Sequence, residues 1–309
     1  MKKIFIDGRA GTTGLRITER LEARPDIGLI ALSEEERKDP VSRKKAIRSA
    51  DVVFLCLPDA AAEEAVSFAE NPDTVILDTS TAHRTAPGWV YGFPELSPEF
   101  EEQIRTSKRI AVPGCHASGF IALVRPLVEA GLIGKNLPLS CYSLTGYSGG
   151  GKKMIAQYEA PERDILLDAP RQYGLNQQHK HLREMKAVSG LEKEPVFCPI
   201  VADFYSGMEV TVPLFAEWMK WGGAEDIREV YRKKYTGPIV RFSENADADG
   251  LLSAGALAGK DSMEISVFGN GDRILLTARY DNLGKGASGA AVECLNIVLG
   301  TDRIAGLNL

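Results

Sequence analysis

Cys115 is the residue with the clearest capacity for chemistry. It follows Pro113 and Gly114, after the apolar stretch 109–112 and before the helical stretch 120–130. The first turn of a helix favours a thiolate through the helix dipole, and its unpaired N–H groups can stabilise a developing oxyanion. The position therefore predicts a cysteine nucleophile, with a structural cysteine as the alternative.

The other cysteines have apolar surroundings. Cys56 lies among valine and leucine, and Cys294 lies beside Val292 and Leu295. We interpret these two, together with Cys141 and Cys198, as small packing residues. An odd total of five, with wide spacing and no CxxC, indicates a reducing compartment, the cytoplasm, rather than a disulfide framework or a zinc knuckle.

A glycine-rich turn follows the first apolar run of the chain. Gly8, Gly11 and Gly14 are spaced as GxxGxxG, with Thr12 and Thr13 before the last glycine. Glycine permits a tight turn, and a following helix offers free N–H groups to a pyrophosphate. The spacing differs from GxGxxG and would also fit a turn without a ligand, but its position after the first strand favours a dinucleotide site.

The residues after the second apolar run indicate which dinucleotide binds. An NAD enzyme usually has an acidic residue there for the ribose 2′-OH. Here Ser33 precedes three glutamates, and Arg37 and Lys38 come next. Ser33, Arg37 and Lys38 favour the 2′-phosphate of NADP, although the glutamates also fit a solvated charged segment.

Together, a thiolate and a nicotinamide restrict the chemistry. The thiolate would attack an activated acyl group, or an aldehyde in reverse, and hold the product as a thioester while hydride is transferred. Such a site also needs a general acid or base and cationic groups for the leaving anion.

Two kinds of pattern divide the chain into the elements that must position these groups. Apolar runs at 3–6, 27–32, 51–57, 74–77 and 109–112 alternate with helical stretches, which predicts a parallel, doubly wound sheet. The second half has strand-like stretches within 196–214, a helix at 223–234 and a hairpin within 263–280, which predict an α+β domain. A final helical stretch, 285–299, has an apolar stripe.

Composition narrows the class of protein. The chain has 309 residues, enough for two domains, and a net charge of −5 with 7% aromatic residues, which argues against a nucleic-acid or anionic-membrane binder. The first residues become polar too early for a signal peptide, and no apolar run approaches the ~20 residues of a membrane helix.

Eight short stretches, spread over nearly the whole chain, give a resemblance to a known family; they are 8–14, 55–59, 78–84, 91–96, 113–115, 147–152, 179–181 and 281–286. In this order they resemble the N-acetyl-gamma-glutamyl-phosphate reductases, in the shorter, type 2 branch. The resemblance implies NADPH-dependent reduction of N-acetyl-L-glutamyl 5-phosphate to N-acetyl-L-glutamate 5-semialdehyde and phosphate, in arginine biosynthesis. It also implies a homodimer or homotetramer.

The implied fold is that of semialdehyde dehydrogenase and glyceraldehyde-3-phosphate dehydrogenase. A Rossmann-like NADP-binding domain would comprise 1–114 with 285–309, and an α+β catalytic and oligomerisation domain would comprise 115–284. The last helix is expected to return to the nucleotide domain.

The resemblance also assigns roles to individual residues. Cys115 matches the nucleophile, and His179 and His181 match paired histidines of which one is the acid/base; which one is left open. A surface pair or a metal-ligand pair with Glu184 are the alternatives, although thioester chemistry needs no metal. The resemblance further implies that the substrate is bound by Arg84, Lys152 and Glu184. It implies that the cofactor is contacted by Ser148, Gly149 and Asn282.

The sequence differs from the family pattern at one place, and several other functions are considered as alternatives. Where the family more often has Pro-Glu-Ile, the chain has Arg183-Glu184-Met185. The local backbone is therefore expected to lack the restraint of a proline, while Glu184 and both histidines are retained. The rival functions are an acyl-phosphate reductase acting on aspartyl phosphate or on carrier-linked glutamyl or aminoadipyl phosphate, a non-catalytic NADPH-binding regulator, and a cysteine hydrolase.

Overall fold

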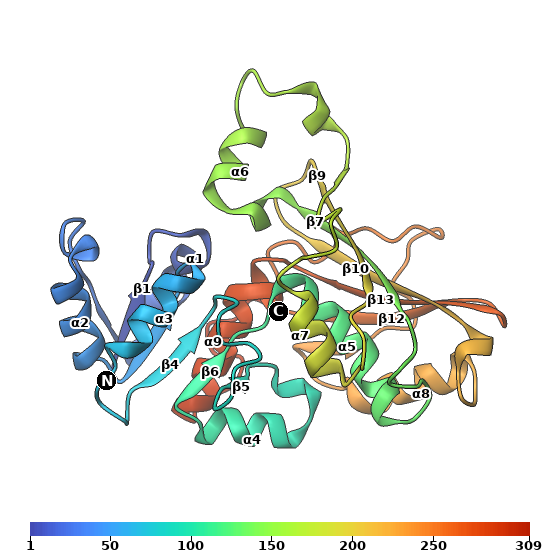
Figure 1. Cartoon of the computed structure of the whole chain (residues 1–309), viewed down its shortest axis with the longest axis horizontal. Helices are drawn as coiled ribbons and strands as arrows, with labels where there is room; N and C mark the ends of the chain where they lie inside the picture. Colours follow the sequence, from blue (N-terminus) through green and yellow to red (C-terminus); the bar gives the residue numbers. More distant parts are fainter. The chain divides into compact units, whose positions relative to one another are not determined.

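The computed structural model describes all 309 residues, which form two compact units (Figure 1). Unit 1 comprises Met1–Pro113 and Ala287–Leu307, and unit 2 comprises Gly114–Gly286 and Asn308–Leu309. The chain therefore leaves the first unit immediately before Cys115 and returns to it near the C-terminus. None of its helices is both long and apolar enough to cross a membrane.

Unit 1 is built on a six-stranded sheet in the order β2-β1-β3-β4-β6-β5, in which every pair of neighbours is parallel. Its central strands are fully buried, which explains why they appear in the sequence as nearly continuous apolar runs. The strands are β1 (Lys2–Asp7), β2 (Ile27–Ile30), β3 (Val52–Leu55), β4 (Val75–Asp78), β5 (Val90–Tyr91) and β6 (Arg109–Ala111).

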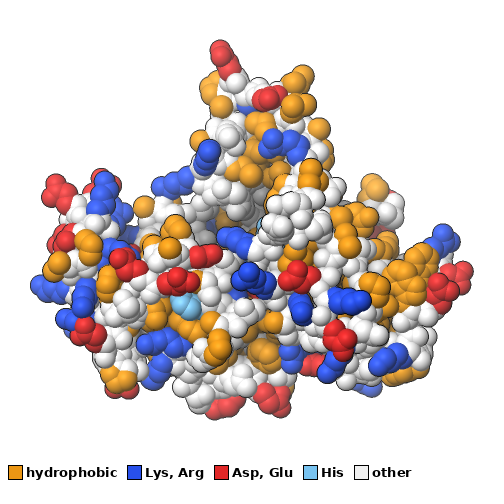
Figure 2. Space-filling model, in the orientation of Figure 1, with side chains coloured by type: hydrophobic (Ala, Val, Ile, Leu, Met, Phe, Trp, Pro, Cys, Tyr) orange, Lys and Arg blue, Asp and Glu red, His pale blue; other side chains and the backbone are white.

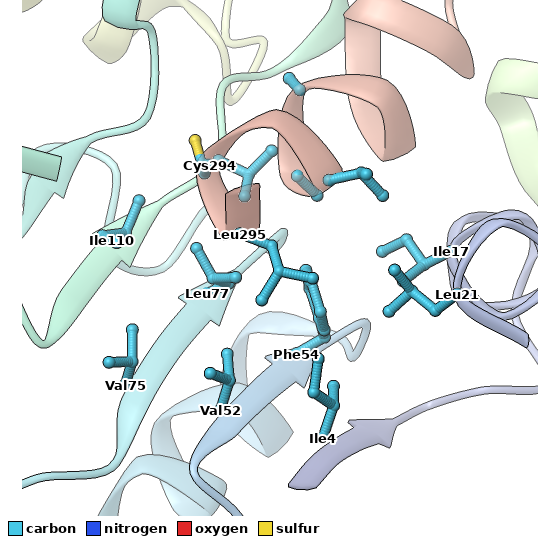
Figure 3. Close-up of a cluster of buried hydrophobic side chains, with 14 of the residues drawn as sticks. Ile4, Ile17, Leu21, Val52, Phe54, Val75, Leu77, Ile110, Cys294 and Leu295 are labelled. Atoms are coloured by element: carbon cyan, nitrogen blue, oxygen red, sulfur yellow. The ribbon is translucent and has the colours of Figure 1, made fainter. Parts of the chain in front are cut away.

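Helices cover both faces of this sheet; they are α1 (Thr12–Glu22), α2 (Pro40–Ser49), α3 (Asp59–Ser67), α4 (Pro98–Thr106) and α9 (Gly289–Leu299). On one face Phe54 and Leu77 pack with Ile17 of α1 and Leu295 of α9 (Figure 3). On the other face, side chains of α2 and α3 pack against strands β1, β3 and β4. This is the doubly wound arrangement that alternating strands and helices predict.

The C-terminal helix α9 belongs to the core of unit 1 and is not a surface helix. The sequence predicts a single apolar stripe, yet every residue from Gly289 to Ile297 is buried. Glu293 lies inside this buried segment because Arg303 pairs with it, with an Nε–Oε1 distance of 2.6 Å. Buried carboxylates need such a partner, so the ion pair explains a charge within an otherwise apolar helix.

Unit 2 is built on a seven-stranded mixed sheet in the order β11-β12-β13-β10-β7-β9-β8. The hairpin predicted within 263–280 is formed by β12 and β13, which pair antiparallel from Met263↔Tyr280 to Gly269↔Ile274. The strands are β7 (Ser140–Gly146), β8 (Arg171–Gln172), β9 (Val196–Ala202), β10 (Met208–Phe215), β11 (Val240–Phe242), β12 (Met263–Gly269) and β13 (Arg273–Tyr280).

Helices α5 (Cys115–Glu129), α7 (Leu182–Ser189) and α8 (Ala224–Lys234) pack together against the sheet of unit 2. The hydroxyl of Tyr235, just after α8, donates to the Ala122 carbonyl of α5 at 2.6 Å. Helix α6 (Gly151–Tyr158) and the loop after it extend away from the sheet (Figure 1). Helix α5 is almost completely buried, so its first residue is held on a rigid element.

Charges of both signs are interspersed on the surface. Figure 2 shows Lys and Arg side chains alternating with Asp and Glu over the face in view, without an extended patch of one sign. The face in view therefore has no basic patch of the kind that binds a phosphate backbone, and the net charge of the chain is −5.

Candidate active site and cofactor site

Cys115 is the first residue of α5, and Gly114, in an extended conformation, is its N-cap. The thiol-bearing residue is half-buried and lines a cavity of about 230 Å³ in unit 2. The Tyr280 hydroxyl donates to the Cys115 carbonyl at 2.5 Å and accepts from the Gly119 N–H at 3.0 Å. These bonds fix the first turn of α5, so the cysteine stands at a helix N-terminus as the sequence predicts.

The backbone beside Cys115 leaves little room for a side chain at Gly286. A Cβ added there would lie 3.1 Å from the Cys115 Cβ and 3.0 Å from the Asp281 carbonyl oxygen. The absence of a side chain thus allows the segment after β13 to approach Cys115 closely.

Glu184 connects the residue before Cys115 to the paired histidines. Its carboxylate, 1% exposed on α7, accepts from the Gly114 N–H at 3.1 Å. The other oxygen, Oε1, lies 3.9 Å from His181 Nε2. One buried carboxylate therefore fixes the N-cap of α5 and faces an imidazole. Arg183 lies in the first turn of α7, where a helix accepts proline and other residues alike.

His179 and His181 both line the cavity, with ring centroids 4.7 Å apart. The His181 backbone N–H donates to His179 Nδ1 at 3.2 Å, so the neutral form of His179 carries its proton on Nε2. The sequence left open which histidine is the acid/base. In the structure the two have different surroundings, because the carboxylate of Glu184 faces His181.

A third histidine, His116, lies beside the pair, with ring centroids 5.8 Å from His179 and 5.6 Å from His181. Burial, and to a smaller extent the charge of His179, lowers the pKa of His116 to about 3. Its Nδ1 is 2.6 Å from Ser143 Oγ, and its Nε2 is 2.7 Å from the Tyr173 hydroxyl.

Tyr173 and Lys180 are among the side chains that line the same cavity and that sequence reasoning missed. Tyr173 belongs to no recognisable motif, and its contact with His116 joins residues far apart in the chain. Burial raises the pKa of Tyr173, and the nearby Cys115 charge raises it further. Lys180 stands between the paired histidines, and that position was the available signal.

The turn Tyr147–Gly150 contributes backbone to the cavity through Gly149 and Gly150. The Asn282 side chain anchors this turn, because its Nδ2 donates to Ser148 Oγ at 3.0 Å. Its Oδ1 accepts from the Gly207 N–H at 2.9 Å. Lys152 is exposed in α6 and is not among the residues that line the cavity.

Arg84 lies in unit 1, where its guanidinium donates to backbone carbonyls. Its Nε reaches the Val112 oxygen at 2.9 Å, and Nη2 reaches the Thr79 oxygen at 3.0 Å. Arg84 therefore ties together segments that follow β4 and β6.

The glycine-rich loop lies against a cavity of about 370 Å³ in unit 1. Gly8 has φ +86°, and a Cβ there would lie 2.2 Å from the Cys56 carbonyl oxygen. A Cβ on Gly14 would lie 2.5 Å from the Gly8 oxygen. Only glycine allows this turn, which leads directly into α1 (Thr12–Glu22), so a dinucleotide phosphate would meet an open helix N-terminus.

Cations line the same cavity. Arg37 and Lys38 are among them, as are Arg9 and Arg43, which sequence reasoning did not single out as cofactor ligands. The guanidinium of Arg43 pairs with Asp7 at 2.9 Å and with Glu64 at 3.2 Å. The set suits a ligand with several phosphate groups, so the donors present fit a phosphorylated dinucleotide.

The other predicted cofactor residues do not line this cavity. Gly11, Thr12 and Thr13 form the turn and the start of α1. The Ser33 hydroxyl accepts from the Glu36 N–H at 3.2 Å, and the Ser33 N–H donates to the Glu36 carboxylate at 2.8 Å. No group of three or more His, Cys, Asp and Glu side chains is arranged to hold a metal ion.

Comparison with known proteins matches each unit to a domain of a known family. Residues 3–104 match the family model "Semialdehyde dehydrogenase, NAD binding domain", and residues 115–282 match "Semialdehyde dehydrogenase, dimerisation domain". Solved structures share the fold: aspartate semialdehyde dehydrogenase II from Vibrio cholerae has a TM-score of 0.73 at 15% identity, with 97% of this chain and 98% of that chain covered. The NADP complex of the Candida albicans enzyme has a TM-score of 0.65 at 15% identity, with 97% and 98% covered.

Fold and site thus define a two-domain dehydrogenase with a nucleotide-binding unit and a cysteine-containing unit. Among curated relatives, N-acetyl-gamma-glutamyl-phosphate reductase 2 of Nostoc sp. is 45% identical, with 99% of both chains covered. N-acetyl-gamma-glutamyl-phosphate reductase of Rhizobium meliloti is 44% identical, with 96% of this chain and 98% of the relative covered. The chain belongs to the semialdehyde dehydrogenase family, in its N-acetyl-gamma-glutamyl-phosphate reductase group.

Proposed function

We propose that the chain catalyses the NADPH-dependent reduction of N-acetyl-L-glutamyl 5-phosphate to N-acetyl-L-glutamate 5-semialdehyde and phosphate, a step of arginine biosynthesis. The observation that carries the proposal is Cys115 at the N-terminus of α5, in one cavity with His179 and His181. The names of the relatives supply the substrate. The five free thiols fit the reducing cytoplasm that we propose as its location.

The reaction begins at Cys115. Its thiolate attacks the acyl carbon, a C–S bond forms, and the bond to the phosphate oxygen breaks, which leaves a thioester and releases phosphate. When bound, NADPH supplies the two electrons and the hydrogen that reduce the acyl carbon. Hydride addition leaves the former carbonyl oxygen negative, and a proton from the acid/base converts it to the thiohemiacetal. The same proton returns to the acid/base as the aldehyde forms and the C–S bond breaks to restore the thiolate.

His181 is the proposed acid/base for that proton. A buried carboxylate next to an imidazole orients the ring and stabilises its protonated form, as in other acid/base pairs. Glu184 occupies this place, 3.9 Å from His181 Nε2. We therefore assign Glu184 to orienting His181 and Gly114, in place of the direct substrate contact that the resemblance implies.

The proposed cofactor is NADP(H), bound at the loop of Gly8, Gly11 and Gly14, with the 2′-phosphate near Arg37 and Lys38. We also assign Ser33, Thr12 and Thr13 to the proposed cofactor site, because these residues form its turns. For Ser148, Gly149 and Asn282 the proposed contact is with the nicotinamide end; for Arg84 and Lys152 it is with the substrate anions.

An assay of the reverse reaction tests the function. With N-acetyl-L-glutamate 5-semialdehyde, phosphate and NADP, absorbance of the reduced cofactor should rise, and omitting phosphate should stop it. With NAD the rate should fall at least about tenfold, the scale of one lost charged contact. Turnover only with aspartyl or carrier-linked substrates would show that the chain is a related acyl-phosphate reductase. NADPH binding without any turnover would show that it is a regulator.

Oligomerisation is proposed to use the uncovered face of the unit 2 sheet, because the matched family model of this unit is a dimerisation domain. Side chains of Leu275 and Phe215 are exposed on paired strands β13 and β10, Leu275 to 42%. We propose a second copy of the chain as the occupant, forming a homodimer or, through further contacts, a homotetramer.

Sedimentation of the purified chain should therefore give a dimer or tetramer, and Leu275→Glu should reduce its mass, because a charge in an apolar interface stays desolvated and unpaired. Leu166→Glu is the matched control, since Leu166 is 66% exposed on the extension after α6. If only the Leu166 variant dissociates, the extension and not the sheet face forms the interface.

A further inference from the structure

His116 lies between two hydroxyl groups and remains neutral. It is 3% exposed, and its two ring nitrogens contact Ser143 Oγ at 2.6 Å and the Tyr173 hydroxyl at 2.7 Å. A neutral imidazole has one N–H donor and one acceptor nitrogen. Its two neighbours therefore have different roles, and one of them must donate to the ring.

Burial of Ser143 decides which neighbour donates. Ser143 lies in the middle of β7 with 0% exposure, and the His116 ring is the hydrogen-bond partner of its hydroxyl. If His116 Nδ1 carried the proton, the Ser143 hydrogen would be buried without an acceptor, which costs about 1–3 kcal/mol. Ser143 thus donates to Nδ1, and the His116 proton is on Nε2.

This tautomer determines what Tyr173 can do. The Nε2–H of His116 donates to the Tyr173 oxygen, so the phenolic hydrogen of Tyr173 remains for another acceptor. Tyr173 is half-buried and lines the same cavity as Cys115. We propose that Tyr173 is a further catalytic residue, whose hydroxyl donates a hydrogen bond to the acyl oxygen of the substrate while Cys115 adds to the neighbouring carbon.

The chemistry of the step requires a donor of this kind. As the Cys115 sulfur bonds to the acyl carbon, the carbonyl electron pair moves onto the oxygen, which becomes negative; the pair returns when the phosphate leaves. The tyrosine stabilises this oxygen without transferring its proton. Burial and the charge of Cys115 raise the pKa of Tyr173, which keeps the phenol protonated beside the nucleophile.

The arrangement gives each group in the cavity a separate task. His181 exchanges a proton under the influence of Glu184, whereas Tyr173 supplies a fixed dipole held by His116 and Ser143. Fixed donors are effective because they need no reorganisation during the reaction. Ser143 does not touch the substrate in this scheme, so it is a positioning residue.

Tyr173→Phe tests the proposal, which rests on the function proposed above. The variant should lose about 100-fold in kcat, the usual effect of removing one oxyanion donor, with KM nearly unchanged. Alkylation of Cys115 by iodoacetamide should keep its wild-type rate, because displacement of iodide at a methylene carbon develops no oxyanion. The control is Tyr142→Phe, which removes a phenol from the exposed side chain next to Ser143 on β7.

Wild-type kcat in Tyr173→Phe, or an equal loss in turnover and alkylation, would overturn the proposal. Thermal unfolding checks that the variant is folded. Should it not fold, Ser143→Ala tests the same hydrogen-bond chain: without the serine, His116 can accept from Tyr173, and kcat should fall about tenfold, the scale of one hydrogen bond. Unchanged kcat in Ser143→Ala would overturn the tautomer assignment. If the wild-type protein itself shows no reductase activity, the proposed function fails instead.

Discussion

Replacing Cys115 with serine is expected to lower kcat for acyl-phosphate reduction by at least about 10⁴-fold, because nucleophile removal in covalent catalysis has effects of this size. A serine hydroxyl at the start of α5 remains protonated, whereas a thiol there forms the attacking thiolate. Initial rates with saturating NADPH measure the loss. NADPH binding, followed by its fluorescence, should be unchanged, because Cys115 does not line the nucleotide cavity and is not among the proposed cofactor contacts.

Cys198→Ser is the matched control for this experiment. Cys198 is a half-buried cysteine on β9 that does not line the cavity of Cys115. Its variant should retain wild-type turnover. Activity of Cys115→Ser within tenfold of wild type would show that the reaction does not pass through a thioester.

His181→Asn is expected to lower kcat by about 10²–10⁴-fold, the range for loss of a general acid/base, and to remove one limb of the pH–rate profile. His179→Asn should cost much less, because the Glu184 carboxylate faces His181. The His179 Nδ1 is instead occupied by a backbone N–H. Rates and pH profiles of the two variants provide the measurement.

The two histidine variants act as controls for each other, because both residues line one cavity and lie 4.7 Å apart between ring centroids. Equal losses in both would indicate a jointly held proton. A larger loss in His179→Asn, with the pH limb missing only there, would transfer the acid/base role to His179.

Sequence reasoning predicts well where one physical signal dominates. Strands β3 and β4 are buried on both faces, so their apolar runs identify them. Helix α2 is missed because its sequence is mostly charged and polar, although Asp39 accepts from the Val41 and Ser42 N–H groups as an N-cap and Pro40 begins the helix. Those two residues were a usable start signal.

In the candidate site, too, the sequence identifies only the residues that stand in local motifs. Cys115 and the paired histidines are recognisable because each stands in a local motif. The Ser143–His116–Tyr173 chain joins side chains separated by 27 and 57 residues, so only the fold brings them together. Basic character alone does not identify the lysine of the cavity, because Lys180 lines it and the equally basic Lys152 does not.

Helix α9 has a consequence for the order in which the chain can fold during synthesis. One face of the unit 1 sheet packs against residues Ala290–Ile297, which are translated after all of unit 2 except its last two residues. Until then Phe54 and Leu77 lack their C-terminal covering (Figure 3). The nascent nucleotide-binding unit therefore leaves the ribosome with an open apolar face, and its core closes only when translation is nearly complete.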